Sequence, residues 1–296
     1  MRKHQIVLVL MFFLLNACNP NHSINPTSTP NEHLTQNAMN STYQSTLTPV
    51  DQHSILIEPI ILGNSGLVMV RVELKDVPEL DPLSFITRQG NYWDRSSLPR
   101  GDSFLSNSFY EDGHFSLKAD WNSSTLIARE NFNEDGSAAW VTLEKDEQEI
   151  YRIDTGRGSP VSCLRSLWTF DGHWLLETAF VTETVEDNSV RTNALGQLIQ
   201  DGEDLNQKFG YDESFGFQTI AGKPFYFIRK AEQIKAIVDG EEIPLGFDLI
   251  PHYGCCSSGE MNLQPFQDRV NFFGKQDDTW FFVQIGIPGS VFNPED

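Results

Sequence analysis

The chain has 296 residues, of which 39% are hydrophobic and 11% aromatic, so it can bury a sizeable core and is too apolar to be disordered throughout. It carries 41 acidic against 21 basic residues, a formal net charge of −20 at pH 7. This balance argues against a nucleic-acid partner and against a basic surface for anionic bilayers, because too few cations are available to neutralise phosphates.

The first eighteen residues have the pattern of a bacterial export signal. Arg2 and Lys3 give a short positive start, and ten consecutive apolar residues follow at positions 6–15. A bilayer span needs about 18 or more apolar residues, so this stretch matches the apolar core of a signal peptide instead. The next residues, Leu15-Asn16-Ala17-Cys18, resemble the lipobox of bacterial lipoproteins, in which an aliphatic, a variable and a small residue precede the lipidated Cys. The alternative is an ordinary secretory signal that contains a Cys by chance.

The lipobox resemblance implies that residues 1–17 are removed as a signal peptide and that Cys18 begins the mature chain, with a thioether-linked diacylglyceryl group on its sulfur. Several acyl chains make such an anchor permanent, because each buried CH₂ contributes about 0.8 kcal/mol. The resemblance therefore predicts a protein of the cell envelope, held to a membrane by lipid on the extracytoplasmic side.

A polar segment follows the predicted lipidation site. Residues 19–50 are mostly Asn, Ser, Thr, Pro and Gln, with few apolar side chains. Such a stretch cannot bury enough surface to offset its chain entropy, so we predict a disordered tether over residues 18–50. The tether would act as a spacer between the membrane and a globular domain over residues 51–296.

The sequence from residue 51 onward consists of short β-type runs separated by turn residues. Residues 67–75 alternate, which places Val68, Val70 and Val72 on one face of a strand. Asp-Gly dipeptides begin at positions 112, 135, 171, 201 and 239, and Asp-Gly between apolar runs is a strong hairpin signal because a type I′ turn needs two residues with positive φ. Only residues 193–205 have a weak helical pattern, so an all-β domain is predicted. The other predicted strands are 54–62, 125–130, 138–143, 163–170, 173–180, 224–229, 233–238, 270–273 and 279–287.

A weak internal repeat bears on the architecture. Residues 105–115 align without a gap with residues 164–174, and both contain an apolar strand, an aromatic residue, an Asp-Gly-His turn and a second aromatic residue. The aromatic residues after this and two similar turns are spaced 59, 51 and 55 residues apart; they are Phe115, Trp174, Phe225 and Trp280. A period near fifty residues is typical of four-stranded propeller blades. We therefore predict a small β-propeller-like fold of about five blades, with a β-sandwich as the alternative.

Three cysteines remain for the domain once Cys18 is assigned to lipid. An extracytoplasmic location permits disulfides, and three thiols allow at most one bridge within the chain. The bridge would join Cys163 to Cys255 or to Cys256, and would close a loop of roughly ninety residues worth ~4–5 kcal/mol in the chain-entropy account. A vicinal Cys255–Cys256 bond and free thiols are the alternatives.

The densest group of chemically active side chains lies at residues 249–260. His252, Cys255, Cys256 and Glu260 occur there within a Gly/Ser-rich stretch, so His252 and Glu260 are the candidate binding residues. The spacing is not that of a standard zinc or copper site, which favours a disulfide-pinned loop and no metal. Residues 222–256 resemble the C-terminal parts of uncharacterised secreted, β-rich bacterial proteins, a resemblance that implies no activity.

Signatures of catalysis or of cofactor binding are missing from the sequence. There is no P-loop, dinucleotide glycine motif, Gly-x-Ser-x-Gly elbow or His-Glu-x-x-His, so no catalytic residue and no cofactor is predicted. Residues 131–136 mimic half of a calcium loop, but Thr142 stands where a bidentate Glu is required, which favours a plain hairpin turn.

Two hypotheses for the function remain. The first is a non-enzymatic, membrane-anchored lipoprotein whose β-domain binds a protein or glycan ligand. The second is an extracytoplasmic glycan-active hydrolase that uses paired carboxylates in a propeller channel. Two or three acidic side chains that converge in one aromatic-lined pocket would favour the hydrolase.

Overall fold

The computed structural model describes residues 56–74, 108–111, 114–158, 162–186, 189–253 and 262–291. Strands dominate these ranges, and α2 (Leu205–Phe209) is the one helix among them. The prediction of an all-β domain is therefore confirmed. The predicted signal peptide, Cys18 and the 18–50 tether lie outside the described residues, as do Cys255, Cys256 and Glu260.

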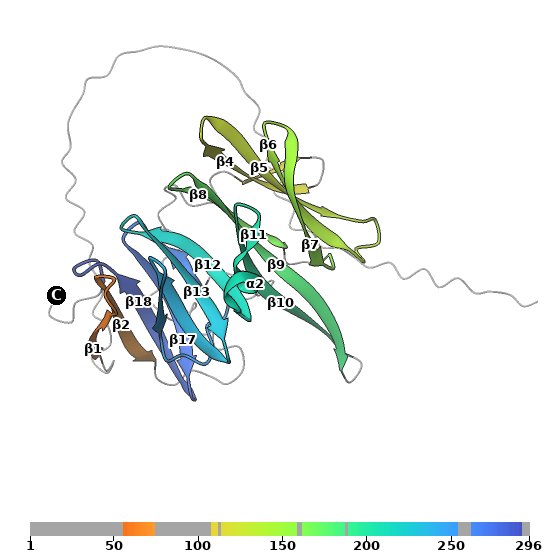
Figure 1. Cartoon of the computed structure of the whole chain (residues 1–296). Coiled ribbons are helices and arrows are strands. Elements are labelled where there is room, and N and C mark those ends of the chain that lie inside the picture. Colours follow the sequence, from red (N-terminus) through yellow and green to blue (C-terminus); the bar gives the residue numbers. More distant parts are fainter. Residues whose placement is uncertain are drawn as a thin grey trace, which may run out of the picture. The chain divides into compact units, whose positions relative to one another are not determined.

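The first and last described strands share one five-stranded sheet (Figure 1). Its order is β1-β2-β18-β17-β16, and β2 pairs antiparallel with β18 through Val72 and Phe282. The strands are β1 (Leu56–Leu62), β2 (Leu67–Leu74), β16 (Gln264–Pro265), β17 (Arg269–Gln276) and β18 (Thr279–Gly286). Both faces of β2 are covered, because Met69 on one face and Val70 on the other are both buried.

A nine-stranded sheet covers the middle of the chain. Its strands are β3 (Ser108–Glu111), β4 (His114–Trp121), β5 (Ser124–Phe132), β6 (Ala139–Lys145), β7 (Gln148–Gly156), β8 (Leu164–Phe170), β9 (His173–Glu186), β10 (Ser189–Gln200) and β11 (Glu203–Asp204). Strand β7 meets β9 at a single parallel pair, Gly156 with Val181. A Cβ at residue 156 would overlap the Val181 carbonyl oxygen, so this junction requires Gly. The sheet thus consists of two halves, β3–β7 and β8–β11, joined at one point.

The third sheet is an antiparallel meander of four strands. They are β12 (Glu213–Ile220), β13 (Lys223–Lys230), β14 (Gln233–Val238) and β15 (Glu241–Pro244). A β-bulge widens β12 between Phe215 and Gln218, because two residues of β12 lie opposite the single residue Tyr226 of β13.

Three hydrophobic clusters join these sheets in chain order. One contains Leu143 of β6 and Leu176 of β9, so the two halves of the large sheet pack on each other. A second contains Leu198 of β10 and Tyr226 of β13. The third joins the four-stranded to the five-stranded sheet through side chains that include Phe227 and Phe272, whose ring centroids are 5.1 Å apart. This face-to-face packing fits a β-sandwich, and the described strands group as five, nine and four rather than as five equal blades.

The type I′ prediction holds at three of the four Asp-Gly turns that the structure describes, and it fails at Asp135-Gly136, where only Gly136 has a positive φ. Asp171-Gly172, Asp201-Gly202 and Asp239-Gly240 each have positive φ at both residues, as type I′ turns require. The aligned repeat also corresponds to equivalent hairpins, since Glu111 pairs with His114 in one and Phe170 with His173 in the other.

The weak helical pattern at residues 193–205 does not correspond to a helix. Residues 193–200 lie in β10, and the helix starts only at Leu205, after the turn at Asp201-Gly202. Asp204, the last residue of β11, caps α2, since its side chain accepts hydrogen bonds from the backbone N–H groups of Asn206 and Gln207. Within the described ranges, no helix has the length and apolar character needed to cross a membrane.

Candidate functional site

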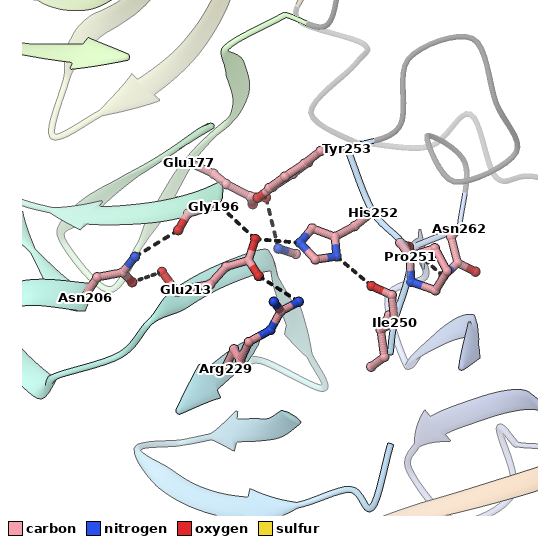
Figure 2. Close-up of polar contacts among 12 residues, drawn as sticks. Glu177, Gly196, Asn206, Glu213, Arg229, Ile250, Pro251, His252, Tyr253 and Asn262 are labelled. Carbon is pink, nitrogen blue, oxygen red and sulfur yellow. Dashed lines mark hydrogen bonds and ion pairs between the residues drawn. The ribbon is translucent and has the colours of Figure 1, made fainter. Parts of the chain in front are cut away.

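His252, one of the two predicted binding residues, has a side chain that is buried inside the protein. Its side chain is 8% exposed and stacks on the Phe215 ring, with centroids 3.6 Å apart and planes 4° from parallel. Nε2 is 2.9 Å from Oε1 of Glu213, and Nδ1 is 2.7 Å from the carbonyl oxygen of Ile250 (Figure 2). Both ring nitrogens are therefore engaged by the protein itself.

Glu213, the first residue of β12, contacts groups from three other parts of the chain besides its own strand. Its Oε1 also accepts a hydrogen bond from the backbone N–H of Gly196 on β10, at 3.0 Å. Its Oε2 lies 3.2 Å from a guanidinium nitrogen of Arg229 on β13. Burial raises the pKa of Glu213, but the hydrogen bond and charge of His252, the Gly196 N–H and Arg229 together lower it by more, so the pKa lies below its ordinary value of 4.5.

A second buried carboxylate, Glu177 on β9, holds the next residue of the same segment. Oε1 accepts the Tyr253 hydroxyl at 2.5 Å and the Gly216 N–H at 3.0 Å. Oε2 accepts the Phe217 N–H and the Ser166 hydroxyl, both at 3.1 Å. The widened part of β12 makes this possible, because Gly216 has a φ of +67° and turns two consecutive N–H groups toward Glu177.

Tyr253 is buried between charged groups. Its ring lies under the Arg165 guanidinium at 4.6 Å, and its backbone has a φ of +56°, which is uncommon for an aromatic residue. Burial and the neighbouring Glu177 carboxylate raise its pKa well above the ordinary value, so the hydroxyl remains a donor. We call Glu177, Arg229, Glu213, His252 and Tyr253 the carboxylate cluster.

Amide side chains complete the surroundings of the cluster. Asn206 donates to the carbonyl oxygen of Gly196 at 2.9 Å and accepts the Ser214 hydroxyl at 2.5 Å. Asn262 donates to the carbonyl oxygens of Pro251 and Phe273 at 2.7 and 2.8 Å. Residues 250–253 are thereby fastened to β9, β12 and β17, which belong to three different sheets.

Most polar atoms of the carboxylate cluster are paired within the protein, although the buried Oε2 of Glu213 has only its ion pair with Arg229 and accepts no hydrogen bond. Each oxygen of Glu177 has two protein donors, and neither nitrogen of His252 is available as a ligand or as a general base. Over the described ranges, no three His, Cys, Asp or Glu side chains are grouped so as to hold a metal ion. The aromatic-lined pair of acids expected of a hydrolase would need carboxylate oxygens free to meet a substrate.

Lowering the pH should reduce the stability of the fold, because the Glu213 carboxylate becomes protonated. A carboxyl whose pKa is lowered by folding contributes stability that is complete above pH 4.5 and is lost as the pH falls through its folded-state pKa. We expect urea-unfolding midpoints of the wild-type protein to fall more steeply between pH 5 and pH 3 than those of Glu213→Gln. Parallel slopes for the two proteins would contradict this account of the cluster.

Cys163, the other described member of the predicted disulfide, is buried in the core of the large sheet at 1% exposure. Its backbone N–H donates to Glu130 at 2.8 Å, and burial together with the charge of Glu130 raises the pKa of its thiol. The structure shows this thiol free, and the bridge to Cys255 or Cys256 stays a prediction.

Alkylation separates a free from a bridged Cys163. Because a thiolate is the reactive form, iodoacetamide should fail to modify this buried thiol in the native protein. In urea without reductant, a free Cys163 should be modified completely, whereas a bridged one should require reductant. Rapid modification of Cys163 under native conditions would contradict its described burial.

The half calcium loop at residues 131–136 is an ordinary turn closed by its own side chains. Asn133 Oδ1 accepts the Ala138 N–H and Asp135 Oδ1 accepts the Ser137 N–H, both at 2.9 Å. The oxygens that would ligate a cation serve the hairpin instead.

Sequence reasoning missed both carboxylates of the cluster. Glu177 had one recognisable signal, because it is the charged residue within the largely apolar β9 run from Trp174 to Phe180. Glu213 and Arg229 had none, since nothing local marks an acid at a strand start as buried.

Comparisons with protein-family models, with curated proteins and with solved structures found no match for this chain.

Proposed function

We propose that this protein is a lipid-anchored, extracytoplasmic lipoprotein whose β-domain binds a protein or glycan ligand without catalysing a reaction. Support for the anchor comes from the lipobox-like Leu15-Asn16-Ala17-Cys18 directly after a signal-length apolar run, and from the polar spacer at residues 18–50. A strongly acidic body on such a spacer would be repelled from anionic headgroups and would stand away from the membrane.

One observation favours binding over hydrolysis. Glu177 and Glu213 are the two carboxylates buried in this part of the interior. Both oxygens of Glu177 accept hydrogen bonds, from β8, from β12 and from Tyr253. Glu213 is held by an N–H of β10, by His252 and by an ion pair with Arg229 of β13. A glycosidase needs one carboxyl that can release a proton to the leaving group and a second that can reach a sugar or a water. The cluster instead serves to join sheets.

For the arrangement of the sheets, we propose propeller-like stacking with about five units. Support comes from four such units among the described residues, the sheets and half-sheets that pack face to face in chain order, and from the pairing of the first strands with the last, which is how a propeller ring closes. The five-stranded sheet has buried side chains on both faces, among them Val70, Phe273 and Phe282, as expected for a sheet that is stacked between others. A crystal structure with an open pair of sheets and no central channel would refute it.

Fractionation of cells that express the protein tests the anchor. The wild-type chain should sediment with membranes and be released only by detergent, whereas Cys18→Ser should be unprocessed or soluble. Cys163→Ser, which leaves the predicted lipidation site intact, is the matched control. Equal retention of Cys18→Ser on membranes in its processed form would reject lipid anchoring.

A paired assay on the intact, detergent-solubilised protein tests the second half of the proposal. Glycan-array binding and glycan hydrolysis are measured on the same preparation, and we expect ligand retention without turnover. Turnover that disappears in Glu213→Gln, with the fold retained by circular dichroism, would replace the binding proposal by the hydrolase.

A further inference from the structure

The hydrogen bonds of His252 determine its charge state. Nδ1 faces the Ile250 carbonyl oxygen at 2.7 Å, and a carbonyl oxygen can only accept. Nε2 faces Oε1 of Glu213 at 2.9 Å, and that oxygen already accepts the Gly196 N–H. An ionised carboxylate also has no proton to donate, so both ring nitrogens must carry a proton for both contacts to be hydrogen bonds.

The surroundings suit such a cation. Glu213 supplies the opposite charge from β12, and Arg229 on β13 neutralises its other oxygen. Through Tyr253, whose ring lies edge-on to the imidazole at 4.6 Å between centroids, the nearest further charges are Glu177 on β9 and Arg165 on β8. The Phe215 ring covers one face of the imidazole and excludes water from it.

We propose that protonated His252 is a pH-dependent latch that fastens residues 250–253 to β10 and β12. When the pH rises and the ring gives its proton to solvent, one nitrogen presents a lone pair to an acceptor. That hydrogen bond is then lost, and two acceptors that repel each other remain in its place. Residues 250–253 therefore lose one of the hydrogen bonds that hold them. The left-handed backbone of Tyr253 lies at the end of the same segment and would be released with it.

Nitrogen-15 NMR of the wild-type protein tests the charge directly. At pH 6.5 we expect both ring nitrogens of His252 to have the shifts of an imidazolium and to correlate with attached protons. His173, which is exposed and contacts Asp201, is the internal comparison. A neutral tautomer at His252 at pH 6.5, with one nitrogen unprotonated, would overturn the proposal.

Hydrogen exchange then tests the latch. Corrected for intrinsic rates, exchange of a peptide covering residues 249–253 should rise about tenfold or more between pH 6.5 and pH 9 in the wild type. In His252→Gln, whose amide does not titrate, this exchange should not change with pH, and in His173→Gln it should behave as in the wild type. Exchange that is independent of pH in the wild type would also overturn the proposal, whether or not the His252 variant folds.

Discussion

Glu177→Ala is expected to lower the free energy of unfolding by about 3–5 kcal/mol, as removal of one partner from a buried charged network generally does. The Glu177 side chain is buried at 4% exposure and accepts hydrogen bonds from donors on β8, on β12 and on the 250–253 segment. Alanine would leave those donors unpaired away from water. Urea unfolding followed by tryptophan fluorescence measures the change.

The matched control for Glu177 is a carboxylate at the surface. Glu242 bonds to Lys230 and Lys235 at 3.0 and 2.9 Å and is about one-third exposed (32%). Glu242→Ala should therefore cost at most about 1 kcal/mol. If both variants lost similar stability, the claim that Glu177 joins the sheets would not stand.

Gly196→Ala is the second change with a large expected effect, about 3 kcal/mol of lost stability. A Cβ at residue 196 would overlap the Ser214 carbonyl oxygen and lie 2.8 Å from the Tyr253 hydroxyl. Strand β10 can approach β12 and the 250–253 segment this closely only without a side chain. The variant should also shift the near-ultraviolet circular dichroism, because Tyr253 must move.

Gly240→Ala separates steric overlap from ordinary glycine strain. Gly240 has a φ of +83° in a hairpin turn, and a Cβ there would meet nothing within 4 Å. Gly240→Ala should lower the free energy of unfolding only through the strain of a positive φ at alanine, by about 1–2 kcal/mol. A loss at Gly240 that exceeded the loss at Gly196 would contradict the close approach of β10 to β12.

Local patterns in the sequence account for what could be predicted of the fold. Alternation of apolar residues and Asp-Gly dipeptides are patterns of only a few consecutive residues. Strands β2 and β9 and the type I′ turns could therefore be predicted from the local sequence alone. Strand β7 was missed because its side chains are mostly exposed and polar. The pairing of β2 with β18 depends on packing between distant parts of the chain, which no local pattern encodes.

In the candidate site, too, the local sequence predicted one residue, whereas the contacts between distant residues could not be predicted. His252 was singled out because cysteines follow it, yet its partner Glu213 is 39 residues away in sequence. Tyr253 bonds to Glu177 across 76 residues. Only the stacked sheets bring these groups together, so their burial and mutual neutralisation could not be derived from spacing.

The mass of the mature N-terminal peptide, purified from membranes, tests the central claim of a lipid-anchored β-domain. We predict a peptide that begins at Cys18 and carries a thioether-linked diacylglyceryl group. A mature chain that retains residues 1–17, or one in which Cys18 bears no lipid, would contradict the claim.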